Sequence, residues 1–211
     1  MKAPKDQASE RRRRWGDQRA LSDEREANQR LLDAAGRCIE RRGSTRISMS
    51  EVAEEAGVTR STLYRYFPNR SDLVTALLLS RAEGFVSASA AALPHPEDAA
   101  QSLSAIILHP VERARESALS VALFAPESEG LAVSVEMESD AVFDIAMRHY
   151  GPLLERWQQT GQLHDDLEIG TIVRWISALA LVLLSSPWRE LTPGERRAFV
   201  DKYVARALLR S

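Results

Sequence analysis

The sequence predicts an all-α protein, and three observations support this fold class. Ala, Leu, Glu and Arg are abundant, while aromatic residues make up only 6% of the chain. Straight-chain side chains lose little rotamer freedom in a helix. Apolar residues recur at spacings of three and four along most of the chain, and no segment alternates convincingly with period two. We therefore expect a small N-terminal three-helix domain followed by a larger helical domain.

The length and the single cysteine narrow the possible classes of protein. A chain of 211 residues accommodates one domain and a small second module. Cys38 alone excludes an internal disulfide and any multi-cysteine zinc site. The first residues lack the apolar core of a signal peptide. The longest apolar run, Trp175 to Leu184, is shorter than the roughly 20 residues of a membrane span, so we expect a cytoplasmic protein.

Charge is distributed unevenly along the chain. Residues 1–70 contain 16 Lys and Arg against 11 Asp and Glu, whereas the remainder contains 12 against 19. A basic N-terminal part on an acidic remainder suggests that only the N-terminal part binds a polyanion. An ordinary solvated surface would give the same distribution of charge. Residues 1–22 include Arg11 to Arg14 and hardly any apolar residue, so we expect a flexible basic arm.

The first domain is expected to cover residues 23–70. Its first helix is marked by an apolar stripe with spacings of three and four, formed by Leu31, Leu32, Ala35, Cys38 and Ile39. Ser48 then opens a capping box, which starts a short helix that stops at Gly57. Thr59 is a suitable N-cap for a second short helix that ends at Phe67.

A linking helix over about 71–91 leads to the second domain, residues 92–211. In this domain the sequence predicts successive helices at about 97–108, 111–124, 131–160, 168–186 and 194–209. Proline and glycine are expected to separate these helices at Pro110, Pro126, Gly130, Gly161 and Pro187. Gly151-Pro152 should kink or split the longest one. A second capping box with proline in the first turn, Thr192 to Glu195, predicts the start of the last helix.

The two short helices of the first domain carry the functional signal. They are joined by a tight Ala56-Gly57-Val58 turn, in which glycine permits a left-handed backbone. A small core is expected to fix them at a steep angle, formed by Val52, Ala53, Val58 and Leu63. The second helix then presents an outer face of Arg60, Ser61, Thr62, Arg65 and Tyr66. This is the arrangement of a helix-turn-helix, whose second helix enters the major groove of DNA.

The segment from Met49 to Leu73 resembles the DNA-binding domain of the tetracycline-repressor (TetR) family. The likeness includes the Ala-Gly-Val turn and the run Leu63-Tyr64-Arg65-Tyr66-Phe67, and it covers about residues 25–80. The resemblance implies an all-helical homodimer, usually a repressor that a small-molecule ligand releases from a palindromic double-stranded DNA operator. We expect no cofactor, and no metal, because no carboxylate–histidine cluster in the sequence has convincing metal spacing.

The resemblance also implies which side chains contact DNA. The base-facing candidates are Arg60, Ser61, Thr62 and Arg65. The phosphate-facing candidates are Ser48, Ser50, Tyr64, Tyr66 and Arg70. Arg70 stands where many members have lysine, and either cation would bind phosphate. The basic arm either reaches into a minor groove or along the backbone, as in other DNA-binding proteins, or is only a flexible solubilising tail.

The second domain offers apolar helix surface rather than a motif. The helix over 168–186 is apolar around most of its circumference, so it must be covered on more than one side. With the last helix it is expected to form a four-helix dimer interface through Ile172, Trp175, Ile176, Leu179, Leu183, Phe199, Tyr203 and Val204. A purely intramolecular core is the alternative. The candidates for a ligand pocket are His109, Phe124, Phe143, Met147, Tyr150 and Trp157, although an ordinary core explains most of them better.

Two other classes of function remain open. An enzyme would need convergent acid, base or nucleophile groups. The sequence has no Gly-rich phosphate loop, no Gly-x-Ser-x-Gly motif and no histidine-rich metal pair, so we expect no catalytic activity. The other class is a helix-turn-helix protein whose second domain recruits protein partners. An enclosed apolar cavity of roughly several hundred cubic ångströms would favour a ligand sensor, and a solid core would favour the partner-recruiting protein.

Overall fold

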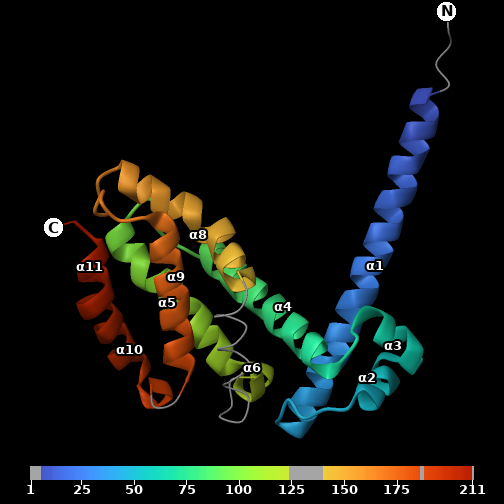
Figure 1. The fold of residues 1–211 in the computed structure, drawn as a ribbon. Helices are drawn as coiled ribbons and strands as arrows, with labels where there is room; N and C mark the ends of the chain where they lie inside the picture. Colours follow the sequence, from blue (N-terminus) through green and yellow to red (C-terminus); the bar gives the residue numbers. More distant parts are fainter. Residues whose placement is uncertain (1–5, 124–139, 186–187, 211) are drawn as a thin grey trace, which may run out of the picture.

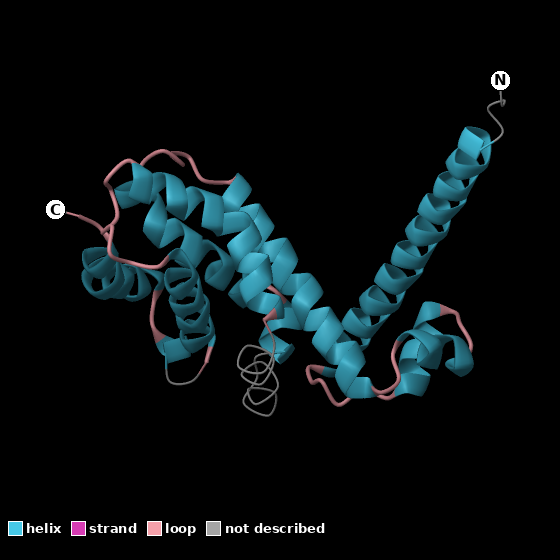
Figure 2. Ribbon diagram, turned by 45° about the horizontal axis from the view of Figure 1, so that its top comes forward, coloured by secondary structure: helices cyan, strands magenta, loops and turns pink. Residues whose placement is uncertain are grey.

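A computed structural model describes residues 6–123, 140–185 and 188–210 of the chain. Within these ranges the regular elements are helices, apart from a single antiparallel bridge between Leu163 and Leu209 (Figure 2). The predicted all-α fold class is confirmed. The first three helices form a unit at one end of the molecule, and the fourth connects this unit to a larger helical body (Figure 1).

The described helices follow one another in the order of their labels in Figure 1. They are α1 (Asp6–Arg42), α2 (Met49–Ala56), α3 (Arg60–Tyr66), α4 (Arg70–Ala91), α5 (Ala99–Glu116), α6 (Ala118–Leu123), α8 (Ala141–Gln159), α9 (Ile169–Leu184), the 3-10 turn η1 (Trp188–Glu190), α10 (Pro193–Val200), the π-helical turn η2 (Asp201–Ala205) and α11 (Arg206–Leu208).

The ends of α2 and α3 are set by local capping. The Ser48 hydroxyl accepts a hydrogen bond from the Glu51 amide, and Glu51 Oε2 accepts one from the Ser48 amide at 2.8 Å. Gly57 ends α2 with φ 67° and ψ 34°, a left-handed conformation that a side chain would oppose. The Thr59 hydroxyl caps α3 by accepting from the amide of Thr62. The predicted capping box, turn and N-cap are confirmed.

Helix α1 is longer than the sequence analysis predicted. It begins at Asp6, so residues expected to belong to a flexible arm, 1–22, are helical from Asp6 onward. This stretch is rich in Arg and also contains two Ala and two Gln. These residues have high helix propensity, and extending an existing helix avoids the cost of nucleation. The apolar period is missing because this part of α1 projects away from the other helices (Figure 1) and needs no buried face.

Helix α5 continues through Pro110, so the break predicted there is wrong. Proline removes one backbone hydrogen bond, but Leu108 and Val111 on either side of it are buried. The helix ends only at Glu116, and α6 follows almost at once. Packing of the flanking residues therefore outweighs the intrinsic cost of proline at this position.

Helix α8 likewise runs through Gly151-Pro152 without splitting. Gly151 is buried, and a Cβ added there would lie only 2.9 Å from Met147 Cε. The glycine therefore serves close packing of a neighbouring side chain rather than a break. The part of this predicted helix that precedes Asp140, and the predicted breaks at Pro126 and Gly130, lie outside the described residues.

Helix α4 joins two hydrophobic cores. The first core is formed by α1, α2, α3 and the first half of α4, which contributes Leu73 and Leu77. Helix α6 adds Leu119 and Leu123 to this core. The second core is formed by α5, α8, α9 and the C-terminal helices, with Val86 from the second half of α4 packed against it. Helix α6 thus packs against the N-terminal unit, although it follows α5 in the chain.

One described helix, α4, is long and apolar enough to cross a membrane by length and composition. The sequence analysis considered only the run from Trp175 to Leu184 and missed it. Core helices of folded domains share these properties. Here α4 packs against α1, α5 and α8, and Arg81 and Glu83 in its middle both form ion pairs with neighbouring helices.

A buried ion pair fastens α10 to α5. Arg196 is 1% exposed, and its Nε and Nη2 donate to the two carboxylate oxygens of Glu112 at 2.7 and 2.8 Å. The remaining terminal nitrogen, Nη1, donates to the carbonyl of Leu191. This bidentate geometry satisfies the guanidinium in a place where an unpaired charge would be costly.

Removing the acceptor of this pair should destabilise the protein. Breaking one side of a buried pair typically costs about 3–5 kcal/mol. The Glu112 side chain is 33% exposed, so we expect Glu112→Gln to lower the free energy of unfolding by about 2–4 kcal/mol. The matched control is Asp165→Asn, which removes a surface pair with Arg210 and should cost less than about 1 kcal/mol. Urea denaturation measures both, and equal effects would contradict a structural role for Arg196.

Candidate nucleic-acid interface and ligand cavity

Helix α3 lies on the surface of the N-terminal unit with one side buried and one side open. Leu63 is completely buried in the first core, together with Phe67 just after the helix. Tyr64 is 48% exposed. The other outward residues are exposed or half-buried, namely Arg60, Ser61, Thr62, Arg65 and Tyr66. The side of α3 that the sequence predicted to face DNA is therefore open to a partner.

Contacts within α3 hold several of these side chains in place. The Thr59 hydroxyl lies 2.9 Å from the hydroxyls of both Ser61 and Thr62. The Arg65 guanidinium lies over the ring of Tyr66, 5.1 Å from its centroid. Stacking of this kind restricts the arginine while leaving most of its five N–H donors free for a base edge or a phosphate.

Three arginines in the last turns of α1 have a different task, because they bind acidic residues of α2. Arg37 and Arg41 contact Glu55 at 2.6 and 3.1 Å, and Arg42 contacts Glu51 at 3.0 Å. Hydrogen bonds from Arg37 and then Arg41 lower the pKa of Glu55. The pKa of Glu51 is lowered chiefly by the amide that it caps. These carboxylates are thus neutralised within the unit and repel DNA less.

Three of the candidate phosphate contacts, Ser48, Ser50 and Arg70, lie at helix starts, whereas Tyr64 and Tyr66 lie on α3. Ser48 is exposed at the N-cap of α2, and Arg70 is exposed as the first residue of α4. Free N–H groups and the helix dipole favour anions at such positions. Ser50 is half-buried in the first turn of α2. Arg60, Arg65 and Arg70 form no ion pair with a carboxylate among the described residues, so their charge is available to a polyanion.

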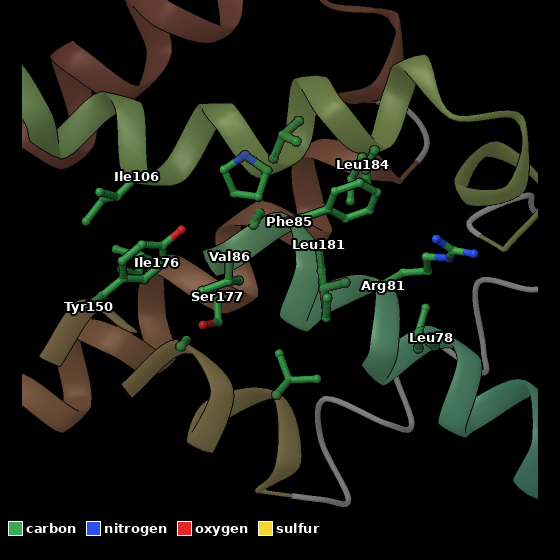
Figure 3. A pocket seen from close by; sticks show the side chains of 17 residues that line it. Leu78, Arg81, Phe85, Val86, Ile106, Tyr150, Ile176, Ser177, Leu181 and Leu184 are labelled. Carbon is green, nitrogen blue, oxygen red and sulfur yellow. The ribbon is translucent and has the colours of Figure 1, made fainter. Parts of the chain in front are cut away.

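The helical body contains a cavity of about 100 Å³ between α4, α5, α8 and α9 (Figure 3). Its walls are mainly aliphatic side chains with one phenylalanine, Phe85. The volume is smaller than the several hundred cubic ångströms expected of a typical ligand pocket. It is nevertheless several times the roughly 10–15 Å³ that one water requires. The core of the helical body is therefore not fully packed, and the cavity has room for a small molecule.

Two polar groups in the cavity wall lack partners. Tyr150 is 3% exposed, and its hydroxyl makes no hydrogen bond of normal geometry with a described residue. Burial raises the pKa of Tyr150 well above its usual value, and the nearby Ser89 hydroxyl opposes this shift. The Nε of Arg81 is also buried without a partner among the described residues. Unsatisfied buried polar atoms are rare in folded proteins and invite a functional explanation.

Among the predicted pocket residues, Tyr150 lines the cavity and most of the others do not. His109 is exposed on α5, and Trp157 is fully buried with its Nε1 donating to the Pro96 carbonyl at 2.8 Å. The prediction is wrong for His109 and Trp157, because neither reaches the cavity. Phe124 lies outside the described residues.

The prediction is also wrong for Phe143 and Met147. Both belong to α8, but neither lines the cavity. Arg174 lies over the Phe143 ring at 4.0 Å from its centroid, and Met147 lies against Gly151. The contribution of α4 was not predicted, because this helix was expected only to link the two domains. The missed lining residues of α4 are Leu78, Arg81, Ala82, Phe85 and Val86.

Helix α9 and the segment after it expose a largely apolar surface, which we call the α9 face. On α9 it consists of a stripe with spacings of four, three and four, namely Thr171, Trp175, Ala178 and Val182. Beside the C-terminal helices, the rings of Trp188 and Phe199 lie 5.0 Å apart, and those of Phe199 and Tyr203 lie 5.2 Å apart. Trp175 is 42% exposed and Tyr203 is 56% exposed.

The predicted dimer-interface residues divide into two groups. Trp175 and Tyr203 are exposed, and Leu179 and Phe199 are half-buried. The other four are at most 3% exposed and belong to the second core of a single chain, namely Ile172, Ile176, Leu183 and Val204. The prediction is wrong for these four, because residues already covered by their own chain cannot form an interface. Val182 and Trp188, which are exposed, were missed.

Comparison with known proteins concerns first the N-terminal unit. A family model described as bacterial regulatory proteins, tetR family, matches residues 31–77. The transcriptional regulator TtgR from Pseudomonas putida is 38% identical over 60 residues, which are 28% of this chain and 29% of TtgR, so the match spans less than a third of that relative. An uncharacterized HTH-type regulator from Mycobacterium tuberculosis is 25% identical over 181 residues, 84% of this chain and 83% of the relative.

Solved structures extend the likeness to the whole fold. The TetR family repressor AlkX from a Dietzia species has a TM-score of 0.65 and 23% identity, covering 85% of this chain and 93% of AlkX. RolR in complex with resorcinol has a TM-score of 0.66 and 18% identity, covering 89% of this chain and 90% of RolR. At such identities the likeness shows a shared fold. The family match places a TetR-type DNA-binding domain at residues 31–77, and the solved structures show that the described chain as a whole shares the fold of TetR family regulators.

Proposed function

We propose that the protein is a homodimeric, sequence-specific repressor that binds a palindromic operator and is released by a small molecule. The open side of α3 supports the DNA-binding part of the proposal, because Arg60 and Arg65 are exposed there and form no ion pair with a carboxylate of the described residues. AlkX is described as a repressor and RolR as a complex with resorcinol, which supports repression and ligand response. We further propose that the protein has no catalytic role and acts in the cytoplasm, where bacterial DNA lies.

Selection of DNA fragments by the purified protein tests this proposal. Sequencing of the retained fragments should return an inverted repeat whose half-sites lie about 34–36 Å apart, or a multiple of that distance. This spacing places both copies of α3 on one face of the duplex. Fragments without a common sequence, or no retention at low salt, would contradict the proposal.

The arginines of α3 and α4 should differ in their effect on specificity. Arg60→Ala and Arg65→Ala should weaken binding to the selected operator by about 1–3 kcal/mol relative to random DNA if they contact base edges. Arg70→Ala should weaken all duplexes alike and reduce the slope of log K against log salt by about one unit.

Fluorescence anisotropy over a salt series measures both effects. The control is Arg156→Ala on α8, an exposed arginine of the body, which should leave binding unchanged. Equal losses on the operator and on random DNA for Arg60 and Arg65 would show that both contact phosphates rather than bases.

The homodimer part of the proposal is supported by the α9 face. Exposed apolar side chains gathered on one part of a monomer often mark an interaction surface. Two copies of α9 and α10 related by a twofold axis would place the same patch on itself and bury Trp175, Val182 and Tyr203. The same twofold axis would match the symmetry of a palindromic operator.

A charge on the α9 face should dissociate the dimer. Trp175→Glu would bury a carboxylate without a partner, and we expect the dimer dissociation constant to rise by about 100-fold or more, since such burial costs several kcal/mol. The matched control is Tyr64→Glu on α3, since Tyr64 is an aromatic residue of similar exposure, 48% against 42%. Analytical ultracentrifugation measures both variants. An unchanged mass for Trp175→Glu would place the dimer interface elsewhere.

Release from DNA would act through α4, which lines the cavity and also belongs to the core of the N-terminal unit. A ligand that tilts α4 would change the separation of the two copies of α3 and forfeit one half-site.

A single spin label per subunit can measure this separation in the dimer. The label would be attached at Tyr64→Cys in a Cys38→Ala background, because the native thiol is buried on α1. The distance between the two labels should change when an effector is added. An effector that weakens operator binding without changing this distance would contradict the mechanism.

A further inference from the structure

The cavity and the contact between α4 and α1 share one side chain, Arg81. In Figure 3 Arg81 lies at one end of the cavity and Tyr150 at the other, with Val86 and Ser177 between them. Ser89, which acts on the Tyr150 hydroxyl, lies eight residues after Arg81, or about 12 Å further along the helix axis. The two unsatisfied polar groups are therefore separated by an elongated apolar space.

The guanidinium of Arg81 lies between the cavity and the N-terminal unit. Its Nη2 is 3.7 Å from Oδ1 of Asp33 on α1. Gly36, three residues further along α1, lies close to the same nitrogen, since a Cβ added there would be in ordinary contact with it at 3.6 Å. The Nε, by contrast, is buried and lacks a partner among the described residues. Arg81 thus has one weak partner on α1 and one buried donor without a partner among the described residues.

We propose that the cavity takes a small amphipathic monoanion whose carboxylate-like group binds Arg81 in competition with Asp33. This inference rests on the proposed function as a ligand-responsive regulator. A carboxylate can accept hydrogen bonds from two guanidinium nitrogens at once, so it satisfies the unused Nε. The apolar body of the ligand lies against Phe85 and Leu181, and the Tyr150 hydroxyl is free to bond a polar substituent at its far end.

The charges around the cavity favour an anion over a cation. The nearest acidic residue of α4 outside the cavity lining, Glu83, is already bound to Arg148 at 2.7 Å and to His149 at 2.6 Å. The lining itself contains one charged residue, Arg81, and no carboxylate among the described residues. A cationic ligand would therefore meet a like charge and no counter-ion.

Competition for Arg81 would link the cavity to the DNA-binding unit. If the ligand takes the guanidinium, the ion pair between α4 and α1 is lost. By thermodynamic reciprocity, loss of Asp33 must then strengthen binding of the anion. The side chains of Arg81 and Asp33 are 40% and 45% exposed, and pairs of this kind change an equilibrium by up to about fivefold.

Two probes with the same apolar body test the inference on the full-length protein by isothermal titration calorimetry. They are 4-phenylbutyrate, a carboxylate, and the neutral 4-phenylbutanol. The carboxylate should bind at least about tenfold more tightly. Arg81→Met should abolish this preference while the alcohol still binds, which shows that the cavity remains intact. Asp33→Asn should strengthen carboxylate binding by about two- to fivefold and leave the alcohol unchanged.

The matched control is Arg156→Met, an exposed arginine on α8 outside the cavity lining, which should retain the preference. Equal binding of the two probes, a preference that survives in Arg81→Met, or no binding of either probe would each overturn the inference. A protein that still selects an inverted repeat from random DNA, yet gives one of these results, remains a DNA-binding regulator. The two proposals therefore fail independently.

Discussion

The rest of the structure depends on α4, because this one helix packs into both hydrophobic cores. Its first turns bury Leu73 and Leu77 with α1, α2 and α3, and its later turns bring Val86 against the body. A continuous helix transmits displacement along its axis, because each turn is hydrogen-bonded to the next. Close packing on both sides disfavours intermediate positions. A change in the volume enclosed by α4, α5, α8 and α9 therefore acts on the helix that positions α3.

The N-terminal unit could be predicted from the sequence because its signals are local. The cap at Ser48, the left-handed turn at Gly57 and the cap at Thr59 each depend on residues at most four positions apart. The division of labour among its arginines could not be predicted. Arg37 and Arg60 have the same charge, but only the first lies against a carboxylate, and this depends on how α1 packs on α2. Net charge indicates a polyanion partner without showing which cations are free.

The body was harder to predict because its features are set by long-range packing. Proline usually ends a helix, yet Pro110 lies inside α5 where buried neighbours hold the helix together. An apolar helix such as α9 gives no sign of which side meets the core. Ile176 and Trp175 are adjacent in sequence, but one is 3% exposed and the other 42%. The cavity residues of α4 were missed for the same reason, since a linking helix and a pocket-lining helix have the same pattern.

A regulator needs two states that lie close in free energy, and its ion pairs are distributed accordingly. Arg196 is buried and bidentate with Glu112, so it keeps α10 fixed against α5 and preserves one side of the body. The pair of Arg81 and Asp33 is longer, at 3.7 Å, and partly exposed, which places it among pairs worth about 0–1 kcal/mol. A ligand shifts an equilibrium only by its difference in affinity for the two states. A buried clamp between α1 and α4 would exceed what a small ligand can overcome, whereas a weak contact allows the shift.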